Sequence, residues 1–83
     1  MEEIREWIIN WFEKNSTATR NDIESKQEEN YFNTGWIDSF AFINFISDIE
    51  ENFKISFSND EFQDRDFATI NGLVKIIKGK LNV

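Results

Sequence analysis

Apolar residues at helical spacing constrain the fold of this 83-residue chain more than any other feature. Near the amino terminus they stand at positions i, i+3, i+4, i+7 and i+8, and the set is Ile4, Trp7, Ile8, Trp11 and Phe12. A similar set follows near the carboxyl terminus, namely Ile70, Leu73, Val74, Ile77 and Leu81. Such stripes cover one face of an amphipathic helix. The spacing predicts helices over residues 2–14 and 69–81.

A further helix is predicted from Asp38 or Ser39 to about Phe53, because either side chain can accept a hydrogen bond from the free N–H groups of a first turn. At about 100° per residue, one arc of this helix contains the predicted buried face, which is Phe42, Phe45, Ile46, Ile49 and Phe53. The predicted outer surface contains Phe40 and Ile43 with the polar residues Asn44, Ser47, Asp48, Glu50 and Glu51. An apolar strip edged by carboxylates suits the docking of a partner protein.

The segments between these helices are more polar. Residues 15–37 are predicted to form a long loop, and loops beyond roughly 12 to 15 residues are usually functional or disordered. Aromatic residues in this loop predict that it packs across the bundle. Residues 54–57 are predicted to be extended, with Ile55 and Phe57 directed inward, and a helix of one or two turns is expected from Ser58. No linker or repeat divides the chain, so residues 1–83 are predicted to form one all-α domain.

The chain contains no histidine and no cysteine, which excludes most acid/base, nucleophilic and transition-metal chemistry. We therefore expect a carrier or binding protein and not an enzyme. A hydrolase that uses only carboxylates would need two acids in a concave pocket, which a domain this small seldom supplies. The acidic residues 60, 61, 64 and 66 lack the glycine and terminal glutamate of an EF-hand, so we expect a solvated turn and no metal site.

Sixteen acidic and nine basic residues give a net charge of −7. This charge opposes binding to nucleic acids and to anionic membranes, whereas it favours a basic partner protein. The amino terminus is acidic and has no continuous apolar stretch, so neither a secretory signal nor a membrane anchor is expected. We expect a soluble, cytoplasmic monomer.

Residues 35–40, with the sequence Gly-Trp-Ile-Asp-Ser-Phe, resemble the Gly-x-x-Asp-Ser-Leu attachment motif of acyl carrier proteins, the phosphopantetheine-binding family. Phe40 stands in place of the leucine, and the resemblance extends over nearly the whole chain. It implies a four-helix bundle with a long loop between the first and second helices and a short third helix. It also implies that Ser39 Oγ is joined to 4′-phosphopantetheine, whose thiol holds an acyl or aminoacyl group as a thioester. The implied partners are a phosphopantetheinyl transferase and the acyl-loading and acyl-transfer enzymes of a biosynthetic pathway.

Several interpretations stay open at this point. Asp38 is either a helix cap or, by similarity to the family, a contact for the transferase and its magnesium ion, and both roles are compatible. Residues 61–62 and 67–71 resemble D-alanyl carrier proteins, although Phe67 and Ile70 replace a tryptophan and a proline. Trp36 either anchors the loop, which we favour, or borders a channel for cargo. The alternative from another class is an unmodified acidic adaptor, in which Ser39 only caps a helix and a basic partner binds the outer surface.

Overall fold

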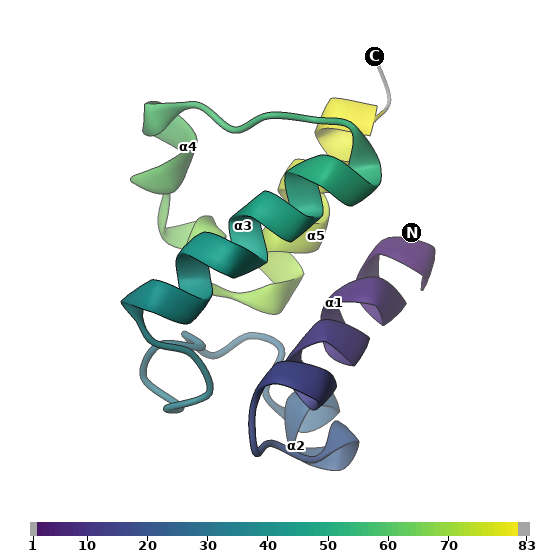
Figure 1. The fold of residues 1–83 in the computed structure, drawn as a ribbon, viewed down its shortest axis with the longest axis vertical. Helices are drawn as coiled ribbons and strands as arrows, with labels where there is room; N and C mark the ends of the chain where they lie inside the picture. Colours follow the sequence, from purple (N-terminus) through teal and green to yellow (C-terminus); the bar gives the residue numbers. More distant parts are fainter. Residues whose placement is uncertain (1, 82–83) are drawn as a thin grey trace.

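A computed structural model describes residues 2–81, and every regular element in that range is helical. The elements are α1 (Glu2–Asn15), α2 (Arg20–Ser25), α3 (Ser39–Phe53), α4 (Asn59–Phe62), the 3₁₀ helix η1 (Arg65–Ala68) and α5 (Ile70–Leu81). Figure 1 shows α3 across the middle of the bundle, with α1 beside it and α5 behind. The predicted all-α class is therefore confirmed. No helix among residues 2–81 is long and apolar enough to cross a membrane.

The predicted boundaries of the long helices agree with the structure to within one or two residues. Asp38 caps the start of α3, and Lys54 ends that helix in the left-handed conformation with φ of 59°. The short helix α4 begins with a capping box, in which Ser58 Oγ accepts from the Glu61 N–H and Glu61 Oε1 accepts from the Ser58 N–H. Reciprocal bonds of this kind satisfy two donors that a helix start otherwise leaves unpaired.

The segment 15–37 differs from the prediction of a continuous loop, because it contains α2. Thr19 Oγ1 caps this helix by accepting a hydrogen bond from the Asp22 N–H at 3.2 Å. Ile23 is its one buried residue. Arg20 also pairs with Glu24 at 3.3 Å and with Glu13 of α1 at 3.6 Å. A single apolar residue produces no periodic stripe, which is why the spacing of apolar residues gave no sign of α2.

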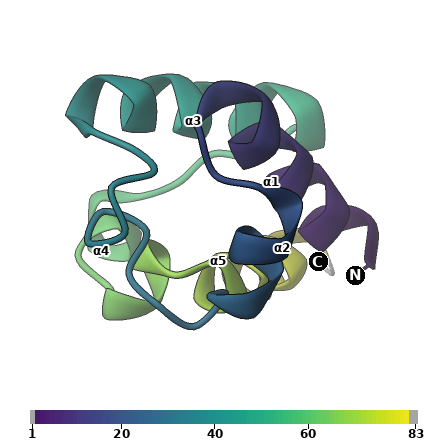
Figure 2. The ribbon, with the colours of Figure 1, turned by 90° about the horizontal axis from the view of Figure 1, so that it is seen from below.

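Aromatic rings join the helices in the core. The Phe45 ring of α3 lies 4.6 Å from the Trp11 ring and 5.0 Å from the Phe12 ring, both of α1. Its centroid is 6.0 Å from that of Tyr31 in the loop before α3. In Figure 2, α3 runs along the upper edge and α5 lies below it. All four rings belong to the buried core cluster. Ring contacts therefore connect α1, the loop and α3.

The predicted buried face of α3 is confirmed for Phe45, Ile46 and Ile49, each of which is buried. Phe42 and Phe53, the other two residues of that face, are half-buried and pack against the core. Both lie toward the margins of the core. The link over residues 54–57 is non-helical beyond Lys54, and Ile55 and Phe57 pack inward against the core, as expected.

Gly72 of α5 lies against the backbone of η1. A Cβ atom placed on Gly72 would lie 2.1 Å from the backbone oxygen of Asp66. No real Cβ adopts such a distance, and the obstacle is backbone, which cannot rotate away. Gly79, in the same helix, has nothing within 4 Å of the corresponding position. Only Gly72 is therefore required by packing.

We predict that Gly72→Ala lowers the free energy of unfolding by roughly 2–3 kcal/mol, because η1 and α5 must separate to admit the methyl group. Gly79→Ala is the matched control, and it should raise the free energy of unfolding by up to about 1 kcal/mol, since alanine is the better helix former. Urea denaturation of both variants measures the difference. Equal effects of the two substitutions would contradict the close packing of η1 on α5.

Candidate functional site

The loop that leads into α3 is fixed at Tyr31. The Tyr31 backbone N–H donates to the Ala68 oxygen at 3.0 Å, and the Tyr31 hydroxyl donates to the Phe67 oxygen. Burial raises the pKa of Tyr31 above its ordinary value, so the hydroxyl remains a protonated donor at neutral pH. The ring itself is fully buried. These contacts hold the loop against η1.

Between Tyr31 and the start of α3 the chain makes a tight turn. Asn30 Oδ1 accepts a hydrogen bond from the Phe32 N–H at 2.8 Å, and Thr34 Oγ1 donates to the Tyr31 oxygen at 2.9 Å. Gly35 follows with φ of +83°, a backbone conformation that residues with a Cβ rarely adopt. The glycine that begins the motif at residues 35–40 is therefore required by the direction that the chain takes.

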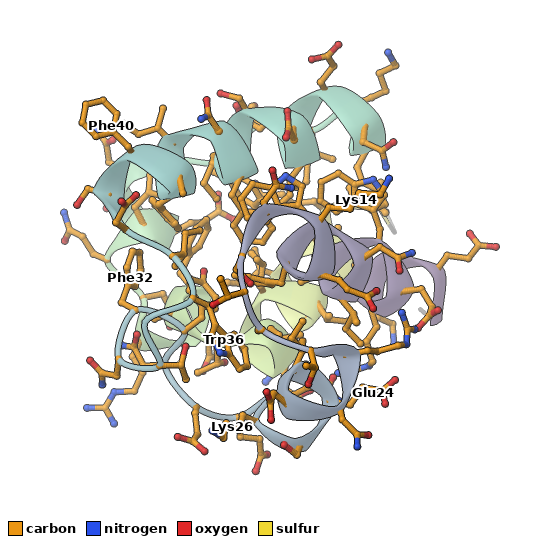
Figure 3. All side chains as sticks on the ribbon, turned by 60° about the horizontal axis from the view of Figure 1, so that its bottom comes forward. Lys14, Glu24, Lys26, Phe32, Trp36 and Phe40 are labelled. Carbon is orange, nitrogen blue, oxygen red and sulfur yellow. The ribbon has the colours of Figure 1, made fainter. Side chains whose placement is uncertain are left out.

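Trp36 and Ile37, at the end of the loop, pack against the core. The Trp36 ring packs edge-to-face on Phe12, with 5.7 Å between centroids, and Ile37 is 6% exposed. Figure 3 shows Trp36 well away from Phe40, which lies at the start of α3. This packing is the geometry expected of an anchor for the loop.

Asp38 and Ser39 form the start of α3. Asp38 Oδ1 accepts a hydrogen bond from the Ala41 N–H at 2.8 Å, which gives Asp38 the role of helix cap. Ser39 is the first helical residue, and its side chain is exposed. Free N–H groups and the helix dipole place partial positive charge at this end of a 15-residue helix. The position suits a hydroxyl that is to carry a phosphate.

The outer surface of α3 is largely as predicted. Phe40 is 83% exposed and Ile43 is 64% exposed, although both are large apolar residues. Asn44, Ser47 and Glu51 are exposed beside them. In Figure 3 the Phe40 ring points away from the bundle. The result is an apolar strip that begins next to Ser39 and has acidic and polar neighbours.

Two acids that were assigned to this surface have partners within the molecule. Asp48, which is exposed, accepts a hydrogen bond on Oδ2 from Trp11 Nε1 of α1 at 2.8 Å. Glu50 is half-buried, and its Oε2 accepts from the Phe57 N–H at 3.0 Å. The prediction that Glu50 lies on the outer surface is therefore wrong, because its carboxylate supports the link after α3.

A shallow groove runs along one flank of α3. It is lined by Phe42, Ile43, Ile46, Ser47 and Phe62, and its volume is about 190 Å³. Four of these residues follow Ser39 on the same helix, and the fifth, Phe62, belongs to α4 and is 41% exposed. Phe62 is not among the predicted site residues. Its one distinguishing feature in the sequence is that it is an aromatic residue among acidic and polar ones.

The helix α4 is attached to the bundle through Glu61 and Phe62. Lys80 Nζ of α5 pairs with Glu61 Oε1 at 2.8 Å, and the Phe62 ring lies 4.9 Å from the buried Phe67 ring. Partial burial acts to raise the pKa of Glu61, but hydrogen bonds from Lys80 and Ser58 outweigh it, so the pKa is lowered overall. Glu61 therefore holds one wall of the groove in place.

Two of the acidic residues around α4, Glu61 and Asp64, accept hydrogen bonds from backbone N–H groups. Asp64 Oδ1 accepts from the Asp66 N–H at 2.9 Å and caps η1. Among the described residues 2–81, no group of three or more acidic side chains has the arrangement needed to hold a metal ion.

We predict a pH dependence for the Glu61 contact. The pKa of Glu61 is lower in the folded state than its ordinary value of 4.5, so the contact stabilises the fold above that pH and is lost as the pH falls through the folded-state pKa. The difference in the free energy of unfolding between wild type and Glu61→Gln should be largest at pH 6–7 and should narrow below pH 4.5. Denaturation at a series of pH values measures it. A difference that stays constant down to pH 3 would contradict the role of the charged carboxylate.

Comparison with known proteins identifies the family of the chain. The sequence matches the family described as "Phosphopantetheine attachment site" over residues 16–77, which is most of the chain and includes α2, α3, α4 and η1. This match and the all-helical bundle define a carrier domain of the acyl carrier type. The chain belongs to the phosphopantetheine attachment site family, whose domains carry covalently bound 4′-phosphopantetheine. No curated protein and no solved structure gave a match.

Proposed function

We propose that Ser39 is the attachment residue and that the protein carries an acyl or aminoacyl group to partner enzymes of a biosynthetic pathway. The observation that supports this proposal is the exposed Ser39 side chain at the first position of α3, directly after the cap Asp38. A phosphate on that oxygen would lie at the positive end of the helix dipole. A D-alanyl or other aminoacyl cargo is a variant of the same proposal.

The prosthetic group supplies a thiol, which the chain lacks because it contains no cysteine. The residues of the chain hold the proposed attachment site in place. Asp38 keeps the first turn of α3 intact, Tyr31 holds the loop against η1, and the exposed start of α3 leaves the hydroxyl accessible to a transferase. With no histidine and no cysteine, the chain lacks the residues that most often supply acid/base and nucleophilic chemistry.

The test of attachment is an intact-mass measurement. Wild-type protein incubated with coenzyme A and a promiscuous phosphopantetheinyl transferase should gain the mass of one arm, and Ser39→Ala should gain none. Ser56→Ala is the matched control, since it removes another exposed hydroxyl, from the link after α3, and should be modified fully.

Two results would overturn attachment at Ser39. One is modification of Ser39→Ala, and the other is an unmodified wild type with several transferases. The second result would favour an unmodified acidic adaptor. Circular dichroism of Ser39→Ala verifies that the fold survives, as expected for an exposed side chain.

We also propose that partner enzymes dock on the outer surface of α3, which is defined by Phe40, Ile43, Asn44, Ser47 and Glu51. The apolar pair would supply contact area next to Ser39. The acidic composition of the chain, with net charge −7, favours partners with a basic surface. Asp48 and Glu50 flank this surface. Asp48 also accepts a hydrogen bond from Trp11, and Glu50 accepts one from the Phe57 N–H, so both residues contribute to the fold. The cytoplasmic location and the monomeric state stay predictions.

A substitution at Ile43 tests the docking surface. Ile43→Asp should lower kcat/KM for the transferase or a cognate loading enzyme by roughly tenfold or more, because a carboxylate would be desolvated in the contact. The free energy of unfolding should change by less than about 0.5–1 kcal/mol, since Ile43 is 64% exposed. Leu81→Asp, an equivalent change at an exposed leucine of α5, should leave transfer unchanged. Equal loss in both variants, or a large loss of stability in Ile43→Asp, would contradict the assignment.

A further inference from the structure

Residues 27–31 of the loop before α3 pair with residues 67–71, where η1 ends and α5 begins. We call this pairing the backbone seam. At one end of it the Asn71 N–H donates to the Gln27 oxygen at 3.0 Å. The Arg5 guanidinium of α1 bridges the two side chains there, because Arg5 Nη1 donates both to Gln27 Oε1 and to Asn71 Oδ1. One guanidinium therefore holds both sides of the seam.

Tyr31 forms the other end of the seam. Its N–H donates to the Ala68 oxygen at 3.0 Å, and its hydroxyl donates to the Phe67 oxygen. Tyr31 is fully buried and Phe67 is 2% exposed, so the loss of the hydroxyl would leave the Phe67 carbonyl without this partner in the core. A buried polar group that loses its partner is costly, and these bonds therefore resist separation of the loop from η1.

The turn after Tyr31 connects the seam to Ser39. The Thr34 N–H donates to the Asn30 oxygen at 3.2 Å, and Thr34 Oγ1 donates to the Tyr31 oxygen at 2.9 Å. The turn is therefore bonded within itself and to the end of the seam. A continuous set of hydrogen bonds of this kind can transmit a displacement of one end to the other. Ser39 follows a few residues later at the exposed start of α3.

The apolar contacts at the end of the loop have a different effect. Trp36 packs on Phe12 and Ile37 is buried, but apolar contacts are non-directional. Hydrogen bonds depend on distance and angle, and they fix which residues of two segments stand opposite each other. The seam is therefore the feature that fixes the register of the loop, and with it the direction from which the chain enters α3.

We propose, on the basis of the proposed attachment at Ser39, that the seam controls how Ser39 is presented to the phosphopantetheinyl transferase, and that Tyr31 and Arg5 are positioning residues for attachment. Both act through the loop. With the seam closed, the Ser39 hydroxyl stands at the start of α3 in the geometry that the transferase binds. With the seam open, the loop can change register. Only the closed fraction of the carrier is then competent, and the apparent affinity of the transferase falls by that fraction.

Steady-state kinetics of the transferase, with the carrier as the varied substrate, test the proposal. Tyr31→Phe keeps the ring and removes one hydroxyl. It should raise KM for the carrier by roughly threefold or more and leave kcat within about twofold of wild type, because the bound carrier has the closed seam. Arg5→Met removes the guanidinium and keeps an unbranched stem, and it should raise KM in the same way. A wild-type KM in both variants, or a loss confined to kcat, would overturn the proposal.

Ile77→Val is the matched control for lost stability. Ile77 is a fully buried residue of α5 that makes none of the hydrogen bonds of the seam. Loss of one buried methyl group destabilises a protein about as much as loss of one hydrogen bond does. Its KM should equal that of wild type, with the fold of each variant verified by circular dichroism. A rise in KM as large as that of Tyr31→Phe would mean that stability alone matters, and the role of the seam would be refuted.

Failure of the attachment proposal gives a different signal, which is a wild type whose mass does not change. A wild type that is modified normally, beside variants of unchanged KM, refutes the seam and leaves attachment intact. Amide hydrogen exchange tests the seam without the transferase. Tyr31→Phe should speed exchange over residues 30–38 more than over α1, whereas Ile77→Val should not. Equal acceleration of both segments in Tyr31→Phe would contradict a seam that controls the loop.

Discussion

The packing of Phe45 between Trp11, Phe12 and Tyr31 is the interaction on which the rest of the structure depends. It joins α3 to α1 and to the loop before α3, with ring centroids 4.6–6.0 Å apart. A chain of 83 residues buries a limited core, and without cysteine it has no disulfide to compensate. Large rings supply contact area efficiently in such a core. Because Tyr31 also bonds to the backbone of Phe67 and Ala68, the same cluster determines where the loop delivers Asp38 and Ser39.

Periodic spacing predicted the three long helices, because each buries a stripe of several apolar residues. It did not predict α2, which buries only Ile23 and is stabilised by the Thr19 cap and by the ion pairs of Arg20. Capping residues alone are common in loops, so Thr19 was a weak signal on its own. The pair of Arg20 with Glu24 is local, at i and i+4, but the pair with Glu13 joins α2 to α1, and the pattern within α2 does not indicate that contact.

The candidate site also has features that the sequence predicted and features that it did not. The start of α3 and the exposure of Phe40 and Ile43 follow from the helical arc, which is a property of one helix. The partners of Asp48 and Glu50 come from α1 and from the link after α3, so a projection of α3 by itself could not assign them. The groove needs Phe62, which only the packing of α4 on Phe67 brings alongside α3. At the site, the helices α3 and α4 were predicted, whereas the contacts between elements were missing from the prediction.

Ile43 belongs both to the outer surface and to the groove, and this dual position has a consequence under the proposed function. It is 64% exposed, and it also lines the groove with Phe42 and Phe62. A partner enzyme that covers Ile43 would therefore also shield the groove from solvent, because this one side chain belongs to both.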